Sequence, residues 1–204
     1  MEEVDDHHLI NKIRDFVTNV GNEEHVIGVV LRRSIRVNER WRDYEYIHQV
    51  EDGLCTWFTF MNLWSYIHGY MPNIEFTGSP ISGVNSDQMI EFFSWIHDNN
   101  PNNLNFQFAI DSTSNPEQQL NTSTQLVDFL DTISAGSMII GAKGLCTALH
   151  RVGEDAFVLV DPLNLQGLEV FSRNNAIAHL TSLLEAPNDI GSFFYFIGPD
   201  VNKT

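Results

Sequence analysis

The sequence predicts an α+β fold, in which a helical N-terminal part is followed by a C-terminal antiparallel sheet. Two observations carry this prediction. Apolar residues recur with helical spacing in four early stretches, which are 4–20, 55–69, 86–98 and 122–134. After residue 136, short apolar stretches are separated by turn residues, as in an antiparallel sheet. Since the chain has 204 residues and is 43% hydrophobic, one domain with a sizeable core is expected.

The elements before the first cysteine can be assigned in order. The spacing predicts a helix over 4–20, an extended segment over 25–37 and a long loop over 38–49. We interpret residues 1–44 as an N-terminal extension with a helix and a basic segment, within a single domain that spans 1–204.

The later elements follow from apolar periodicity and from Gly, Pro and Asn punctuation. The patterns predict helices over 55–69, 86–98, 122–134 and 174–185. They predict strands over 104–110, 137–140, 145–152, 156–161, 167–171 and 193–197. The strands over 145–152 and 156–161 form a predicted hairpin around a Gly-Glu-Asp turn.

Composition excludes several classes of function. The formal net charge of −16 argues against a broad nucleic-acid-binding face, although seven of the eleven basic residues precede Cys55. No apolar run is long enough to span a membrane, and the acidic N-terminus is unlike a signal peptide. Two cysteines without a CxxC motif predict neither a disulfide framework nor a zinc site. We expect a reducing, cytoplasmic setting, and the Asn-rich composition fits a viral or bacterial protein, such as an effector in a host cell.

The stretch 49–68 has the pattern of a nucleophile site. A loop with Asp52-Gly53 leads into Cys55, which should begin a buried helix whose N-terminal field favours the thiolate. Gln49 is an amide donor that the loop could fold back beside Cys55, as half of an oxyanion hole. The alternative is an inert cysteine buried in the core.

A general base could come from the predicted hairpin. If its turn centres between Glu154 and Asp155, His150 and Asp161 share a face and the carboxylate can orient the imidazole. If the turn centres on Glu154, they face opposite sides, and Asp161 is left to cap the Pro162 turn. We expect the second cysteine, Cys146, to be a core residue.

A short repeat links the two cysteines. The tetrapeptide Gly-Leu-Cys-Thr occurs at 53–56 and again at 144–147. Because the sequence contexts of the two copies differ, we interpret the repeat as chance.

The order of cysteine, histidine and aspartate resembles that of papain-like cysteine proteases. Asp52-Gly53-x-Cys55-Thr-Trp is similar to the nucleophile motif of the ovarian-tumour deubiquitinases, whose C-terminal histidine motif is missing here. The segment 145–162 and the Gly-Leu-Cys-Thr at Cys55 resemble the herpesvirus tegument-type deubiquitinases. In that family the catalytic histidine stands two residues after the aspartate, where this chain has Leu163.

The resemblance implies a papain-like fold and a deubiquitinase. Cys55 would attack the carbonyl after the C-terminal glycine of ubiquitin or a ubiquitin-like modifier, with Gln49 in the oxyanion hole. His150 would act as the base and Asp161 would orient it, while Trp41, Tyr44 or Trp57 would wall a narrow cleft. The acidic surface would suit basic ubiquitin as the partner, and no metal, cofactor, membrane or nucleic acid is implied.

Two other readings stay open. One is a papain-like protease of another substrate class, which would process a polyprotein or an effector. The other is a catalytically inactive papain-like binding module, which the Leu163 departure favours. The sequence does not indicate an oligomeric state.

Overall fold

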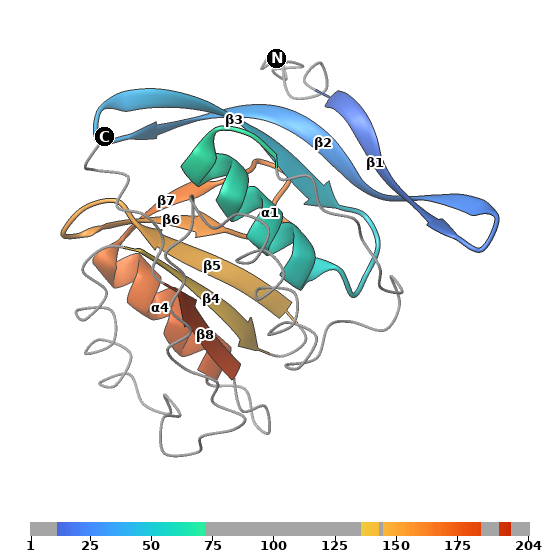
Figure 1. Cartoon of the computed structure of the whole chain (residues 1–204). Coiled ribbons are helices and arrows are strands. Elements are labelled where there is room, and N and C mark those ends of the chain that lie inside the picture. The colour runs from blue at the N-terminus through green and yellow to red at the C-terminus, as the bar shows by residue number, and fades with distance from the viewer. Residues whose placement is uncertain (1–11, 72–135, 143–144, 185–191, 197–204) are drawn as a thin grey trace, which may run out of the picture.

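The computed structural model describes residues 12–71, 136–142, 145–184 and 192–196. These residues form two antiparallel sheets and two helices (Figure 1), which confirms the predicted α+β class. The predicted layout, with a helical part first, is wrong, because the first three elements described are strands of one sheet. Within them, no helix is both long and apolar enough to cross a membrane. The helices predicted over 86–98 and 122–134 and the strand predicted over 104–110 lie outside the described residues.

The first sheet has the order β1-β2-β3. It consists of β1 (Lys12–Val20), β2 (Glu23–Val37) and β3 (Arg40–Gln49). The extended segment predicted over 25–37 is confirmed as β2. Because β2 is 15 residues long, it can pair with both neighbours. Strand β1 pairs with its N-terminal part and β3 with its C-terminal part.

Two predictions in this region are wrong. Residues 12–20 form β1 and not part of a helix, and residues 40–49 form β3 and not a loop. In β1, Ile13 and Val17 have the spacing of a helical face, but both remain about two-fifths exposed, at 40% and 41%. Pairing with the long β2 therefore outweighs the helical pattern. Helix propensity is a weak preference, and tertiary contacts often override it.

A two-residue turn joins β2 to β3. Asn38 and Glu39 both have positive φ, 49° and 65°, as the central residues of a tight hairpin require. Asn38 also donates from Nδ2 to the carbonyl oxygen of Val152, at 2.8 Å. The turn of the first sheet is thus fastened to the end of a strand of the second.

The second sheet has the order β7-β6-β5-β4-β8. Its strands are β4 (Gly136–Ala142), β5 (Leu145–Arg151), β6 (Ala156–Val160), β7 (Glu169–Ser172) and β8 (Ser192–Phe196). Helix α4 (Arg173–Leu184) follows β7 directly. Every element predicted after residue 136 is therefore confirmed, with bounds that differ by a few residues.

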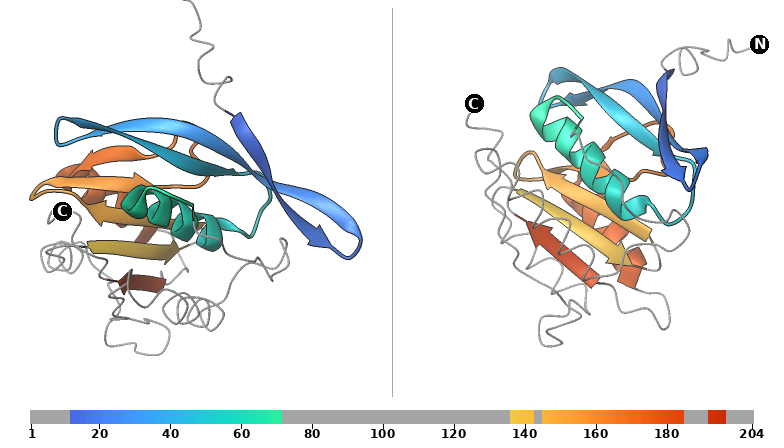
Figure 2. Two further views of the ribbon diagram at one scale, coloured as in Figure 1. Left: turned by 45° about the horizontal axis from the view of Figure 1, so that its top comes forward. Right: turned by 45° about the vertical axis from the view of Figure 1, so that its right-hand side comes forward.

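Helix α1 (Cys55–His68) lies between the two sheets (Figure 2). It begins at the predicted cysteine and ends at Gly69, whose left-handed φ of 80° lets its N–H bond the Ser65 carbonyl at 2.9 Å. Residues 56–66 are all buried, because protein covers the helix on more than one side. This explains why its sequence is apolar nearly all round.

Polar side chains on α1 bond the backbones of both sheets. Asn62, which is fully buried, accepts from the Ile47 N–H at 2.7 Å and donates to the Ile47 carbonyl at 2.9 Å. Ser65 donates to the Glu45 carbonyl at 2.8 Å, and Thr59 donates to the Cys146 carbonyl at 2.8 Å. Side chains of the helix therefore supply hydrogen-bond partners for backbone groups on the edge of β3 that no described strand covers, and for one carbonyl of β5.

The two sheets also meet directly beside α1. The Tyr44 hydroxyl accepts from the Leu168 N–H at 2.9 Å, and the Tyr46 hydroxyl donates to the Asp161 carbonyl. Gly167 lies against the Tyr44 hydroxyl with φ of 93°, so any larger residue would both clash and be strained. These contacts fix β3 over the segment that joins β6 to β7.

Replacing Asn62 by Ala should destabilise the chain by about 2–5 kcal/mol, because both polar groups of Ile47 would lose their buried partner. Chemical denaturation measures this change. Asn174→Ala, at an exposed position of α4, is the control and should change stability by less than about 0.5 kcal/mol. An equally small effect of Asn62→Ala would contradict the role assigned to this side chain.

Candidate functional site

Cys55 has the predicted backbone position. It is the first residue of α1, its side chain is partly exposed, and the first turn of the helix contains no acidic residue. The N-terminal field of the helix is therefore not cancelled locally by a carboxylate. In this respect the site matches the expectation for a nucleophile.

The surroundings of the Cys55 thiol do not match that expectation. Burial raises its pKa, and hydrogen bonds to the backbone of Cys146 and to Thr56 lower it only in part. The thiol therefore packs against β5 in its protonated form, whereas the sequence predicted a thiolate. Desolvation outweighs the helix field here.

Gln49 is buried at the end of β3. Its Nε2 donates to the Glu51 carbonyl at 2.8 Å, and its own N–H bonds the Pro162 carbonyl at 2.9 Å. The side-chain amide thus stabilises the turn that leads into α1. Its role in an oxyanion hole stays a prediction, and one of its two amide hydrogens is already used within the turn.

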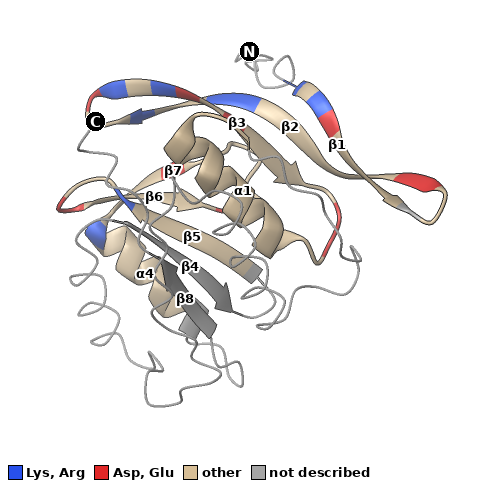
Figure 3. Ribbon diagram, viewed as in Figure 1, with Lys and Arg blue, Asp and Glu red and all other residues tan. Residues whose placement is uncertain are grey.

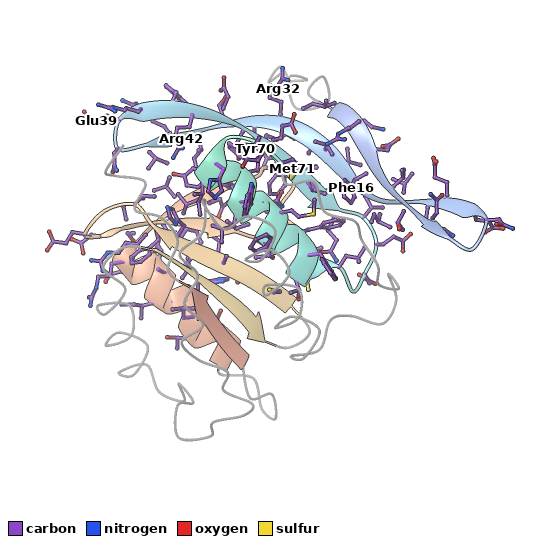
Figure 4. All side chains as sticks on the ribbon, in the orientation of Figure 1. Phe16, Arg32, Glu39, Arg42, Tyr70 and Met71 are labelled. Atoms are coloured by element: carbon purple, nitrogen blue, oxygen red, sulfur yellow. The ribbon has the colours of Figure 1, made fainter. Side chains whose placement is uncertain are left out.

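His150 lies at the opposite end of α1 from Cys55. Its ring centre is 5.6 Å from that of Tyr66. Arg42, which is labelled in Figure 4, stacks over the Tyr66 ring at 4.7 Å. Tyr66 follows Cys55 by 11 residues, which is about 16 Å along a helix. Measured along β5, Cys146 and His150 are about 13 Å apart, which agrees with this separation. The predicted hydrogen bond between Cys55 and His150 is therefore absent.

His150 also has the wrong protonation behaviour for a base. Burial first, and the nearby Arg42 charge second, lower its pKa to about 4. The imidazole is 3% exposed and neutral at physiological pH. It acts as a buried aromatic neighbour of Tyr66.

Asp161 does not orient His150. In the β5–β6 hairpin, Leu149 pairs with Leu159 and His150 pairs with Val158, so the turn centres on Glu154. Asp161 therefore faces away from His150, and the predicted pairing is wrong. Its Oδ1 instead accepts from the Leu163 N–H at 3.0 Å, which is the capping role of the alternative interpretation.

A hydroxyl–imidazole contact exists elsewhere in the second sheet. Thr147 Oγ1 lies 3.3 Å from His179 Nε2 of α4. Burial lowers the pKa of His179, and the Asp161 charge opposes this shift only in part. This contact could not be predicted from local pattern, because it joins a strand to a helix 32 residues later. Since Thr147 is only 4% exposed, we interpret the Thr147–His179 contact as a structural hydrogen bond between β5 and α4.

The aromatic residues expected to wall a cleft are placed differently. Trp57 and Tyr44 are buried in the core, whereas Trp41 is 69% exposed. Among the described residues, no group of three or more His, Cys, Asp or Glu side chains could hold a metal ion.

Comparisons with known proteins identify no relative. No protein-family model matches the chain, and no curated protein or solved structure is significantly similar to it.

Protonation of His150 should make folding sensitive to acid. The pKa of His150 is lowered in the folded state, so the unfolded chain binds the proton more readily. The folded state therefore loses stability relative to the unfolded state as pH falls from about 6.5 to 4. Over that range the wild type should lose up to about 3 kcal/mol more stability than His150→Phe. Denaturation curves at several pH values measure the difference, and parallel losses in the two proteins would contradict the assigned environment.

Proposed function

We propose that this chain is a protein-binding module rather than an active thiol hydrolase. The observation that carries the proposal is the separation of Cys55 from His150 along α1, together with the turn register that turns Asp161 away. The arrangement is still compatible with a papain-like fold, because a helix that begins at a cysteine packs on a later antiparallel hairpin. Under this proposal the chain has a papain-like fold, and a surface of that fold binds a partner protein.

The binding surface we propose is the Trp41 face, defined as Arg32, Arg36 and Trp41. Arg36 and Trp41 lie directly opposite each other on β2 and β3, so their side chains share one face of the sheet. Trp41 is 69% exposed and both arginines are exposed. Trp and Arg are the residues that most often dominate binding energy at protein interfaces.

Charge favours an acidic protein as the partner. Figure 3 shows basic residues along the β2–β3 hairpin and near the start of β1. Neither arginine of the Trp41 face forms an ion pair with another residue in the described part of the chain. Two carboxylates lie on the same face. Asp43 accepts a hydrogen bond from Ser34, which lies opposite it, and Glu45 lies opposite Arg32. Arg36 and Trp41 therefore form the part of the face without a facing carboxylate. A nucleic acid needs a broad basic face, whereas the Trp41 face has only two basic side chains, so a nucleic acid is a poor alternative.

The Trp41 face should bind acidic peptides in preference to basic ones. We expect hexaglutamate to shift the Trp41 indole signal in NMR spectra and hexalysine to leave it unchanged. Trp41→Ala or Arg36→Glu should weaken hexaglutamate binding about tenfold or more.

Tyr70→Ala is the matched control for this experiment. Tyr70 is a 51% exposed aromatic residue that follows α1, and its loss should leave hexaglutamate binding unchanged. Equal shifts with both peptides, or no shift of Trp41 with either, would contradict the proposed surface.

A papain-like cysteine peptidase acting on ubiquitin is the second candidate. It is favoured by the position of Cys55 at the first residue of α1, partly exposed and without an acid in the first turn. Its base would have to be a group other than His150. Ubiquitin would remain the partner in this case, and a protease of another substrate class would share the same nucleophile.

A ubiquitin probe with a C-terminal electrophile separates the two candidates. The binding-module proposal predicts no labelling of Cys55, because the protonated thiol is a poor nucleophile. Mass spectrometry after incubation provides the measurement, with Cys55→Ala as the control. Labelling of the wild type but not of Cys55→Ala would replace our first proposal with the second.

A further inference from the structure

The two cysteines of the chain lie side by side although 90 residues separate them in the sequence. Cys55 opens α1 and Cys146 is the second residue of β5, and both are free thiols. The Cys55 thiol forms a hydrogen bond with the backbone of Cys146. The two cysteines of the repeated tetrapeptides therefore meet in space.

The backbones on both sides of the pair are held in place. Thr59, one helical turn after Cys55, donates to the Cys146 carbonyl at 2.8 Å. Thr56 forms a hydrogen bond with the Cys146 thiol. A disulfide needs Cα atoms about 4.4–6.8 Å apart, and side chains of α1 that bond to Cys146 hold the two segments close together.

The two thiols differ in their access to solvent. Cys55 is partly exposed, whereas Cys146 is only 4% exposed. Burial raises the pKa of Cys146 to about 12, and the neighbouring Cys55 adds to this effect. An external oxidant would therefore reach Cys55 first, and Cys146 would act as the resolving thiol.

We propose that Cys55 and Cys146 form a reversible disulfide that locks the start of α1 to β5 under oxidising conditions. Because burial raises the pKa of Cys55, only the small fraction present as thiolate reacts, and the exchange is slow at neutral pH and faster in mildly alkaline solution. With a disulfide such as oxidised glutathione, this thiolate attacks one sulfur and releases one molecule of glutathione. The Cys146 thiolate then attacks Cys55 Sγ in the mixed disulfide and releases the second glutathione. The protein loses two protons and two electrons, and one oxidised glutathione becomes two reduced molecules.

The proposal does not depend on which function the chain has. In a binding module the bond would stiffen the contact between α1 and the second sheet. In a thiol hydrolase the same bond would block the nucleophile. Both follow from the position of Cys55 and Cys146 alone.

The test is oxidation of the whole purified chain with oxidised glutathione, followed by thiol counting under denaturing conditions and non-reducing peptide mapping. We expect the count to fall from two free thiols to none, with one peptide pair linked through Cys55 and Cys146 in a monomer. The melting temperature should rise by roughly 5–15 °C and return on reduction.

Two variants are matched controls. Cys146→Ser should stop at a stable glutathione adduct on Cys55, and Cys55→Ser should leave the buried Cys146 unmodified. A wild type that keeps the glutathione adduct, that forms only intermolecular dimers, or that retains both thiols would overturn the proposal.

Discussion

The structure depends on the placement of polar side chains along one buried helix. Asn62 of α1 bonds both the N–H and the carbonyl of Ile47, and Ser65 bonds the next outward-facing carbonyl of β3. Thr59 makes the corresponding bond to β5 of the other sheet. A buried backbone group without a hydrogen-bond partner costs free energy of folding. These side chains therefore determine which residues of each sheet lie beside which turn of α1. The apolar residues between them then fill the space that the sheets leave.

This placement decides the chemistry near the two ends of the helix. Holding β5 at Thr59 brings Cys146 beside Cys55, and the direction of β5 then carries His150 toward Tyr66. Cys55 is left with a buried thiol as its neighbour, and His150 with an aromatic ring and the Arg42 charge. Both environments favour neutral groups, since the raised cysteine pKa and the lowered histidine pKa share desolvation as their main cause. The same helix that resembles a nucleophile helix thus separates the nucleophile from its expected base.

The sequence was informative where local pattern and tertiary environment agree. The start of α1 at Cys55, its end at Gly69 and the hairpin of β5 and β6 all follow from spacing and turn residues. It failed for β1 and β3, where neighbouring strands impose structure on segments with helical spacing or many charges. The side on which Asp161 lies could not be predicted, because a one-residue change in turn register reverses every side chain. The meeting of Cys55 with Cys146 could not be predicted, because no local pattern places a residue of β5 beside one that precedes it by 91 positions.

Hydrogen exchange at the Ile47 amide tests the central role of α1 most directly. If Asn62 supplies its buried partner, this amide should exchange in the wild type only through opening of the structure, with strong protection. In Asn62→Ala it should lose far more protection than the amides of β5–β6 pairs such as Leu149 and Leu159. Rapid exchange at Ile47 in the wild type, or equal loss of protection at all of these amides, would contradict the account.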